Sequence, residues 1–347
     1  MFKLVWIFIF GALVSACVPP TDSGPIKVTE IPGPYGGKWI TPESCGWATI
    51  NGRSGMIVSD MGCGYEQPCK TNKDGKYGAV WFIPDGGGQP EKIASGLATP
   101  NGVAADSDGN VWSVDKGHIW VITPDGRNVR ADLPNSGLLN DVTIAPWAPN
   151  TALITDSKMG GIIVAYFDGD KIELADTVYQ SLGDAPNGIA TSNDDNGVVV
   201  ASLGDLVTPG KPGQVHKIAP NPDVYGQCGD WYGSTPTDVT PVVPYKLDGI
   251  VPFARDGVKG HVVSAIFDMA TENNTTLLFW IGPDGGMEQI YDVAQHGMIS
   301  AADIGVDPKT GRVCVPDLAG SGGHTTDFEA AAKVIVIEGL GSSAHKD

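Results

Sequence analysis

The chain has 347 residues and a formal net charge of −18 at pH 7. This acidity argues against a nucleic-acid partner, because binding to phosphates requires a basic surface. A hydrophobic content of 41% is sufficient for a packed core, and 47 glycines with 26 prolines indicate many tight turns. Composition therefore favours an all-β protein whose partner is a small molecule or a cation.

The first residues have the layout of an export signal. Lys3 precedes an apolar run over residues 4–14, which is shorter than the roughly 20 residues that span a bilayer. Val14-Ser15-Ala16-Cys17 resembles the bacterial lipobox, in which cleavage before the cysteine leaves that cysteine lipidated. We therefore predict a lipoprotein signal peptide over residues 1–16. A plain signal peptide or an N-terminal membrane anchor is the alternative.

A flexible tether is predicted for residues 17–30, because prolines, serine and glycine follow the lipidated Cys17. This arrangement predicts a protein of the bacterial cell envelope, lipid-anchored in the outer membrane and facing the periplasm. The lipid anchor is then the only expected contact with a membrane.

A repeat organises the remaining chain. Each copy has a short polar step, an apolar strand, a turn of Asp, Gly or Asn, and a second apolar strand, most clearly over residues 100–115. A further hairpin with an Asp-Gly turn, such as Asp85-Gly86, lies between copies. Four strands over roughly 40 to 60 residues have the dimensions of a propeller blade. The six copies begin near Glu43, Pro100, Leu139, Pro186, Leu247 and Ala301.

This periodicity predicts an all-β, six-bladed β-propeller over residues 31–341, with four antiparallel strands per blade and a C-terminal tail at 342–347. The alternative is a single large β-sandwich in which the turn signals recur by coincidence.

Oxygen-bearing side chains open the predicted inner strands, and antiparallel order brings these positions to one mouth of the central channel. Glu43, Asn140, Asn187 and Asp248 offer the carboxylate and amide oxygens that hard divalent cations prefer. Asn-Gly and Asp-Gly steps also form turns, so a purely structural role is the alternative. Four further residues are predicted to contact substrate or to lie around it: Asn101, Asp141, Asp303 and His296.

The motifs resemble one superfamily, that of senescence marker protein, gluconolactonase and luciferin-regenerating enzyme. Glu43-Ser44-Cys45-Gly46-Trp47 looks like its Glu-Ser-Pro-x-Trp opening. Asn140-Asp141, Asn187-Gly188 and Asp248-Gly249 are similar to its Asn-Asp, Asn-Gly and Asp-Gly steps, in the same order. The resemblance covers nearly the whole mature chain. It implies a regucalcin-type propeller in which Glu43, Asn187 and Asp248 hold one divalent cation and Asn140 contacts substrate.

Carried over, the resemblance implies a metal-dependent lactonase or carboxylic-ester hydrolase with a small-molecule lactone or ester substrate. Ca²⁺ is the expected cation, with Mg²⁺, Mn²⁺ or Zn²⁺ as alternatives. Asp248 is the expected catalytic proton acceptor, since it can touch both cation and water. Leu138 stands where sugar-lactonase members often carry Arg, which argues against a polar aldonolactone.

Other functions remain open for the same architecture, because a fold does not fix a function. The main alternative is a non-catalytic, NHL-like propeller that serves as an envelope binding or scaffold protein. A quinone-dependent sugar dehydrogenase is disfavoured, because the sequence shows no clear set of Arg, His and Lys residues for the cofactor.

The cysteines after residue 17 predict one local disulfide. Cys63 and Cys69 enclose a short loop and are predicted to form a disulfide, since export permits one and the spacing matches no zinc pattern. The pairing of Cys45, Cys228 and Cys314 stays open.

Four aspartates close second strands and are expected to stabilise turns rather than to bind metal: Asp60, Asp115, Asp156 and Asp317.

Overall fold

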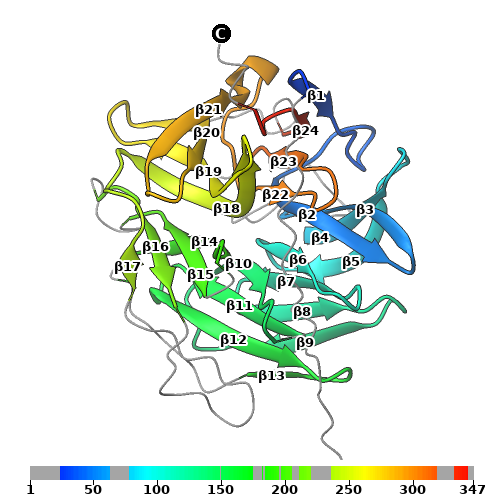
Figure 1. The fold of residues 1–347 in the computed structure, drawn as a ribbon. Helices are drawn as coiled ribbons and strands as arrows, with labels where there is room; N and C mark the ends of the chain where they lie inside the picture. The colour runs from blue at the N-terminus through cyan, green and yellow to red at the C-terminus, as the bar shows by residue number, and fades with distance from the viewer. Residues whose placement is uncertain are drawn as a thin grey trace, which may run out of the picture.

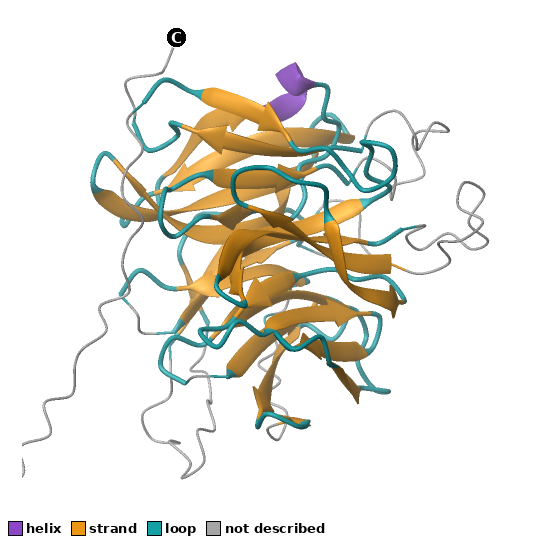
Figure 2. Ribbon diagram, turned by 90° about the vertical axis from the view of Figure 1, so that its right-hand side faces the viewer, coloured by secondary structure: helices purple, strands orange, loops and turns teal. Residues whose placement is uncertain are grey.

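The computed structural model describes residues 24–62, 78–148, 150–174, 182, 184–194, 197–204, 211–219, 236–318 and 332–342. These residues form six antiparallel sheets of four strands each, arranged as a ring (Figure 1). The predicted six-bladed β-propeller is therefore confirmed. The one helical element in the described part of the chain is the 3₁₀ turn η2 (Val293–His296), which stands out in Figure 2. No helix among the described residues is long and apolar enough to cross a membrane.

In each of the first three blades, the strand that comes first in the chain lies nearest the channel (Figure 1). Blade 1 consists of β2 (Pro42–Ile50), β3 (Arg53–Asp60), β4 (Gly78–Pro84) and β5 (Glu91–Leu97). Blade 2 consists of β6 (Val103–Ala105), β7 (Val111–Asp115), β8 (His118–Ile122) and β9 (Asn128–Asp132). Blade 3 consists of β10 (Leu139–Ile144), β11 (Thr151–Asp156), β12 (Gly161–Phe167) and β13 (Ile172–Leu174).

The other three blades follow the same order outward from the channel. Blade 4 consists of β14 (Pro186–Thr191), β15 (Val198–Ser202), β16 (Val215–Ile218) and β17 (Thr237–Asp238). Blade 5 consists of β18 (Tyr245–Arg255), β19 (Val258–Asp268), β20 (Asn273–Ile281) and β21 (Met287–Asp292). Blade 6 consists of β22 (Gly305–Val306), β23 (Val313–Pro316), β24 (Val334–Glu338) and, outermost, β1 (Lys27–Glu30).

Strand β1 closes the ring. It pairs antiparallel with β24, from Lys27 opposite Glu338 to Glu30 opposite Ile335, so the two ends of the described chain share one blade. Residues 27–30, which the sequence assigned to the tether, therefore belong to the propeller. These four residues are largely exposed and gave no alternating apolar pattern from which a strand could be predicted.

Alternating side chains pack each blade against both of its neighbours. In β3, Ile57 joins the apolar cluster shared with blade 2, whereas Met56 and Val58 join the cluster shared with blade 6. Successive side chains of a strand point to opposite faces, so a single strand serves two interfaces. Clusters of this kind fill every gap between neighbouring blades.

Glycine-containing turns set the register of the inner strand pairs. Asn51 and Gly52 link β2 to β3 and have φ angles of 51° and 75°. A two-residue type I′ hairpin requires positive φ at both positions, which Asn and Gly adopt most readily. The turn therefore fixes Ile50 opposite Arg53, and the rest of the register follows from that pair.

Buried aspartates at the ends of second strands anchor the loops that lead into the inner strands. Asp60 Oδ1 accepts a hydrogen bond from the backbone N–H of Thr41 at 2.9 Å. Equivalent bonds run from Ala98 to Asp115 (3.0 Å), from Leu138 to Asp156 (2.9 Å) and from Ser300 to Asp317 (2.9 Å). The four aspartates thus act as backbone acceptors, in the turn-stabilising role expected of them, and hold the residues just before the channel mouth.

Candidate metal centre

Six polar side chains, one from each blade, lie at or near the start of the inner strands. They are Glu43, Asn101, Asn140, Asn187, Asp248 and Asp303, and each is at most 7% exposed. All inner strands start at the same face of a propeller, so these side chains gather around one end of the channel. Asp141 follows Asn140 in β10 and is 4% exposed. We refer to these seven residues as the axial cluster.

Burial raises the pKa of all four carboxyl groups of the axial cluster, and neighbouring carboxylates raise it further for three of them. Burial raises the pKa of Glu43 well above its usual value, and the charges of Asp248, Asp303 and Asp141 raise it further. Burial, reinforced by the charge of Asp303, also raises the pKa of Asp141 and Asp248. Burial raises the pKa of Asp303 itself to about 6.

No Lys, Arg or His among the described residues forms an ion pair with any of these four carboxyl groups. Buried charge without a partner is strongly unfavourable. The channel mouth therefore requires protons or a bound cation to neutralise it.

Hydrogen bonds orient part of the axial cluster. Asn187 donates to the carboxyl of Asp248. The Ser44 hydroxyl donates to Asp303 Oδ2 at 2.5 Å, and the carboxyls of Asp303 and Asp141 are hydrogen-bonded to each other. A carboxyl group can donate only while it is protonated, so a hydrogen bond between Asp141 and Asp303 forms when one of them holds a proton.

Five oxygen atoms of the cluster are buried without any hydrogen-bond partner in the described part of the protein. They are Glu43 Oε2, Asn101 Oδ1, Asn140 Oδ1, Asn187 Oδ1 and Asp248 Oδ1. Leaving a polar atom buried and unpaired costs about 1–3 kcal/mol. Acceptor oxygens without donors are the ligands that a hard divalent cation takes. No group of three or more His, Cys, Asp or Glu among the described residues is arranged to hold a metal alone, so a cation here needs asparagine oxygens.

Hydroxyl groups of three second strands hold the backbone of the next blade at the channel mouth. Ser59 Oγ donates to the Asn101 carbonyl at 2.5 Å, Thr155 Oγ1 to that of Asn187 at 2.6 Å, and Ser264 Oγ to that of Ala302 at 2.8 Å. The Asp141 carboxyl also accepts a hydrogen bond from the backbone N–H of Ile189 at 2.7 Å. Blade 3 therefore holds the backbone of blade 4 at Asn187 and Ile189.

His296 lies apart from the axial cluster. Its Nε2 is 2.9 Å from the hydroxyl of Tyr291, and the two rings are stacked. Tyr291 belongs to β21, the outermost strand of blade 5. The structure therefore does not place His296 where it was predicted to reach substrate. The predicted lipidation at Cys17 and the predicted disulfide between Cys63 and Cys69 lie outside the described residues.

A disulfide that the sequence left open joins Cys45 to Cys314, with an S–S distance of 2.11 Å and a Cα–Cα distance of 6.3 Å. Cys45 follows Glu43 by two residues in β2, and Cys314 lies in β23. Both cysteines are buried. The bond therefore ties the strand that carries Glu43 to the last blade.

No profile of a known protein family and no curated protein matches the chain. Solved structures share its fold. A gluconolactonase from Xanthomonas campestris aligns with a TM-score of 0.56 at 15% identity, over 92% of this chain and 97% of that one. The calcium-binding protein regucalcin from Agrobacterium tumefaciens gives 0.54 at 11% identity, over 87% and 92%.

A third solved structure is an auxiliary nutrient binding protein from Bacteroides thetaiotaomicron, with a TM-score of 0.61 at 10% identity, over 90% of this chain and 76% of that one. At these identities the likeness concerns the fold. The chain thus has the six-bladed propeller fold of the gluconolactonases and regucalcins, as the resemblance in its motifs implied.

Proposed function

We propose that this protein is a divalent-metal-dependent hydrolase of lactones or related carboxylic esters. The observation that carries the proposal is the set of buried, unpartnered oxygens on Glu43, Asn187 and Asp248 at an acidic channel mouth. These three oxygens would hold one cation, with Ca²⁺ as the first choice because all the donors are hard oxygens. The gluconolactonase and regucalcin that share the fold support this proposal.

The chemistry assigned to the cation is to polarise the substrate carbonyl as a Lewis acid. Asp248 is suited to act as general base, since Asp248 Oδ1 has no hydrogen-bond partner in the described part of the chain while Asn187 orients the same carboxyl. In hydrolysis, a water oxygen bonds to the carbonyl carbon and the ionised Asp248 takes the water proton. The bond from that carbon to the alkoxy oxygen breaks, and the proton passes to the released alkoxide.

The remaining side chains of the axial cluster would select the substrate. Asn140 and Asn101 each present a buried amide oxygen that has no partner among the described residues, which suits a hydrogen bond from a substrate hydroxyl or a water. Leu138 lies in the loop leading to Asn140 and presents no charge that would bind a polyhydroxylated lactone. We therefore expect a less polar lactone or ester than an aldonolactone.

Elemental analysis of purified protein, combined with a screen of lactones and aryl esters, tests this function. We expect one divalent cation per chain, and turnover that disappears after chelation and returns on adding Ca²⁺. Asp248→Asn serves as the catalytically impaired comparison. Protein that contains no metal and turns over no substrate would instead be a binding propeller.

We further propose that the protein is exported and anchored by lipid on Cys17. A buried disulfide supports export, since such bonds form in oxidising compartments and are rare in the cytosol. Replacing Cys17 by Ser should release the protein from the membrane fraction. If the variant stays membrane-bound after an alkaline wash, the anchor is not a lipid on this cysteine.

A further inference from the structure

A cavity lies on the face of the propeller opposite the axial cluster. It has a volume of about 300 Å³ and lies beneath blade 1, between turns of blades 2 and 6. Its lining includes Trp47, Ser54, Asp85, Ser107, Asp307 and Lys309. Trp47 follows Glu43 by four residues in β2, which is about 13 Å along a strand. The cavity is therefore separate from the candidate metal centre, and its size lies at the small-molecule end of ligand pockets.

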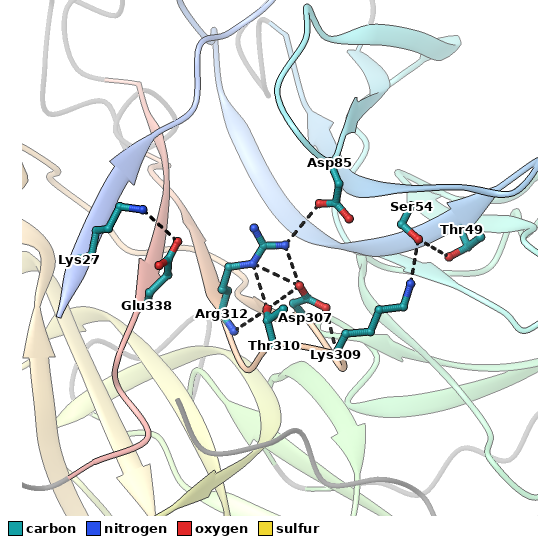
Figure 3. A network of polar contacts seen from close by, with 9 residues as sticks. All are labelled: Lys27, Thr49, Ser54, Asp85, Asp307, Lys309, Thr310, Arg312 and Glu338. Carbon is teal, nitrogen blue, oxygen red and sulfur yellow. Dashed lines mark hydrogen bonds and ion pairs between the residues drawn. The ribbon is translucent and has the colours of Figure 1, made fainter. Parts of the chain in front are cut away.

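One wall of this cavity is fixed by Arg312. Its guanidinium donates to Asp307 Oδ2 at 2.7 Å and to Asp85 Oδ1 at 3.3 Å (Figure 3). The guanidinium carbon also lies 5.7 Å from the centre of the Trp47 ring. Asp307 accepts further bonds from the Lys309 backbone and the Thr310 hydroxyl. The wall is thus built without any ligand, and the Asp307 carboxylate has its partners within the protein.

Two charged groups of the cavity retain unused hydrogen-bonding capacity. Lys309 Nζ donates to Ser54 Oγ at 2.8 Å, which uses one of its three protons, and it forms no ion pair within the described residues. The Asp85 carboxylate accepts only the 3.3 Å bond from Arg312 in that part of the chain, and its side chain is 44% exposed. The Lys309 ammonium can therefore still donate hydrogen bonds, and the Asp85 carboxylate can still accept them, within the same small space.

The lining selects one class of ligand. Three aspartates, Asp85, Asp106 and Asp307, would repel an anion, and Lys309 would repel a cation. A neutral molecule with several hydroxyl groups both donates and accepts, so it satisfies Asp85 and Lys309 together. The Trp47 indole and nearby Ala105 and Pro308 supply apolar surface for the C–H groups of a ring. We propose that this cavity binds a neutral sugar, either free or at the end of a glycan chain.

Isothermal titration of the intact protein with glucose, N-acetylglucosamine, maltose and cellobiose tests this proposal. We expect saturable binding of at least one of them with a dissociation constant on the order of 1 mM. Lys309→Met and Asp85→Asn should each weaken binding roughly tenfold or more. Ser107→Tyr, at an exposed turn position, should block the cavity without removing an internal bond. Tighter binding of a disaccharide than of glucose points to a glycan, and equal binding points to a free sugar.

Two controls separate this cavity from other sites. Lys92→Met removes a lysine of blade 1 that lies over Trp81, outside the cavity, and should bind sugar like the parent. Asp248→Asn should also retain binding, with or without a chelator, because it alters only the axial cluster. Binding of none of the four sugars, unchanged binding in all three cavity variants, or tighter binding of glucuronate than of glucose would overturn the proposal.

Discussion

Cys45 and Cys314 join the inner strand of blade 1 to the second strand of blade 6, across a separation of 269 residues. The same two blades also meet through an apolar cluster that contains both cysteines. Strand β1, which comes just before blade 1 in the chain, completes blade 6. Ring closure therefore rests on a covalent bond, a packed interface and a shared sheet.

Removing this disulfide by Cys45→Ala with Cys314→Ala should lower the free energy of unfolding by about 2–5 kcal/mol, because the bond restricts the unfolded chain over a long loop. Urea unfolding measures the change, and the parent protein unfolded with a reductant is the matched control. Equal stability of the variant and the oxidised parent would contradict the pairing. A peptide map without reduction checks it directly, and also tests the predicted bond between Cys63 and Cys69.

Thr155→Val should weaken metal binding roughly 10–100-fold, because the lost hydroxyl holds the backbone of Asn187 and its loss loosens that ligand. Thr155→Ser keeps the hydroxyl and should bind like the parent. Calorimetric titration measures both variants. An affinity of Thr155→Val equal to that of the parent would mean that the hydroxyl has only a structural role.

Metal-free protein should lose stability as the pH rises from about 4 to above 6. The pKa of Asp303 is raised from 3.8 to about 6 in the folded protein, so the folded state binds more protons than the unfolded state in this window. The stabilisation is fully present below the unfolded pKa and disappears as the pH rises through the folded one. The shifts of Glu43, Asp141 and Asp248 act in the same direction.

Thermal melts in the presence of a chelator measure this pH dependence. Asp303→Asn should reduce the decline, and saturating Ca²⁺ should oppose it because a cation stabilises the ionised carboxylates. The assignment would be contradicted if the stability of the chelated parent did not fall across this window, or fell no more than that of Asp303→Asn.

Two substitutions should separate catalysis from substrate binding if the proposed hydrolase activity is present. Asp248→Asn removes the base and one negative ligand, and should lower kcat roughly 100-fold or more. Asn140→Ala should leave the metal in place and mainly raise KM. Steady-state kinetics on the best substrate of the screen measures both effects. Reversed effects of the two substitutions would exchange the roles assigned to these residues.

The sequence predicted the blades well because their signals are local. Asn51-Gly52 forms a hairpin turn through its own backbone preference, and the apolar alternation of β3 marks both packing faces. Asn-Gly and Asp-Gly steps mark the start of several inner strands, so Asn187 and Asp248 could be assigned to the channel mouth from the order of residues alone.

The features that the sequence missed depend on contacts between distant segments. Residues 27–30 form a strand only because β24 offers a free edge. Cys45 and Cys314 become partners only when the ring closes, and the cavity beneath blade 1 is assembled from turns of three blades. The loop position of His296 predicts a place at the channel, whereas the side chain of Tyr291 holds it at the outer edge of blade 5.

Titration of Ca²⁺ into chelator-treated protein, followed by calorimetry, tests the central proposal most directly. The parent should bind one Ca²⁺ per chain, and both Glu43→Gln and Asp248→Asn should bind at least roughly 100-fold more weakly. Asp85→Asn, which removes a carboxylate on the opposite face, should bind like the parent. Absence of binding in the parent, or equal affinity in the parent and both axial variants, would show that no cation is held by the axial cluster.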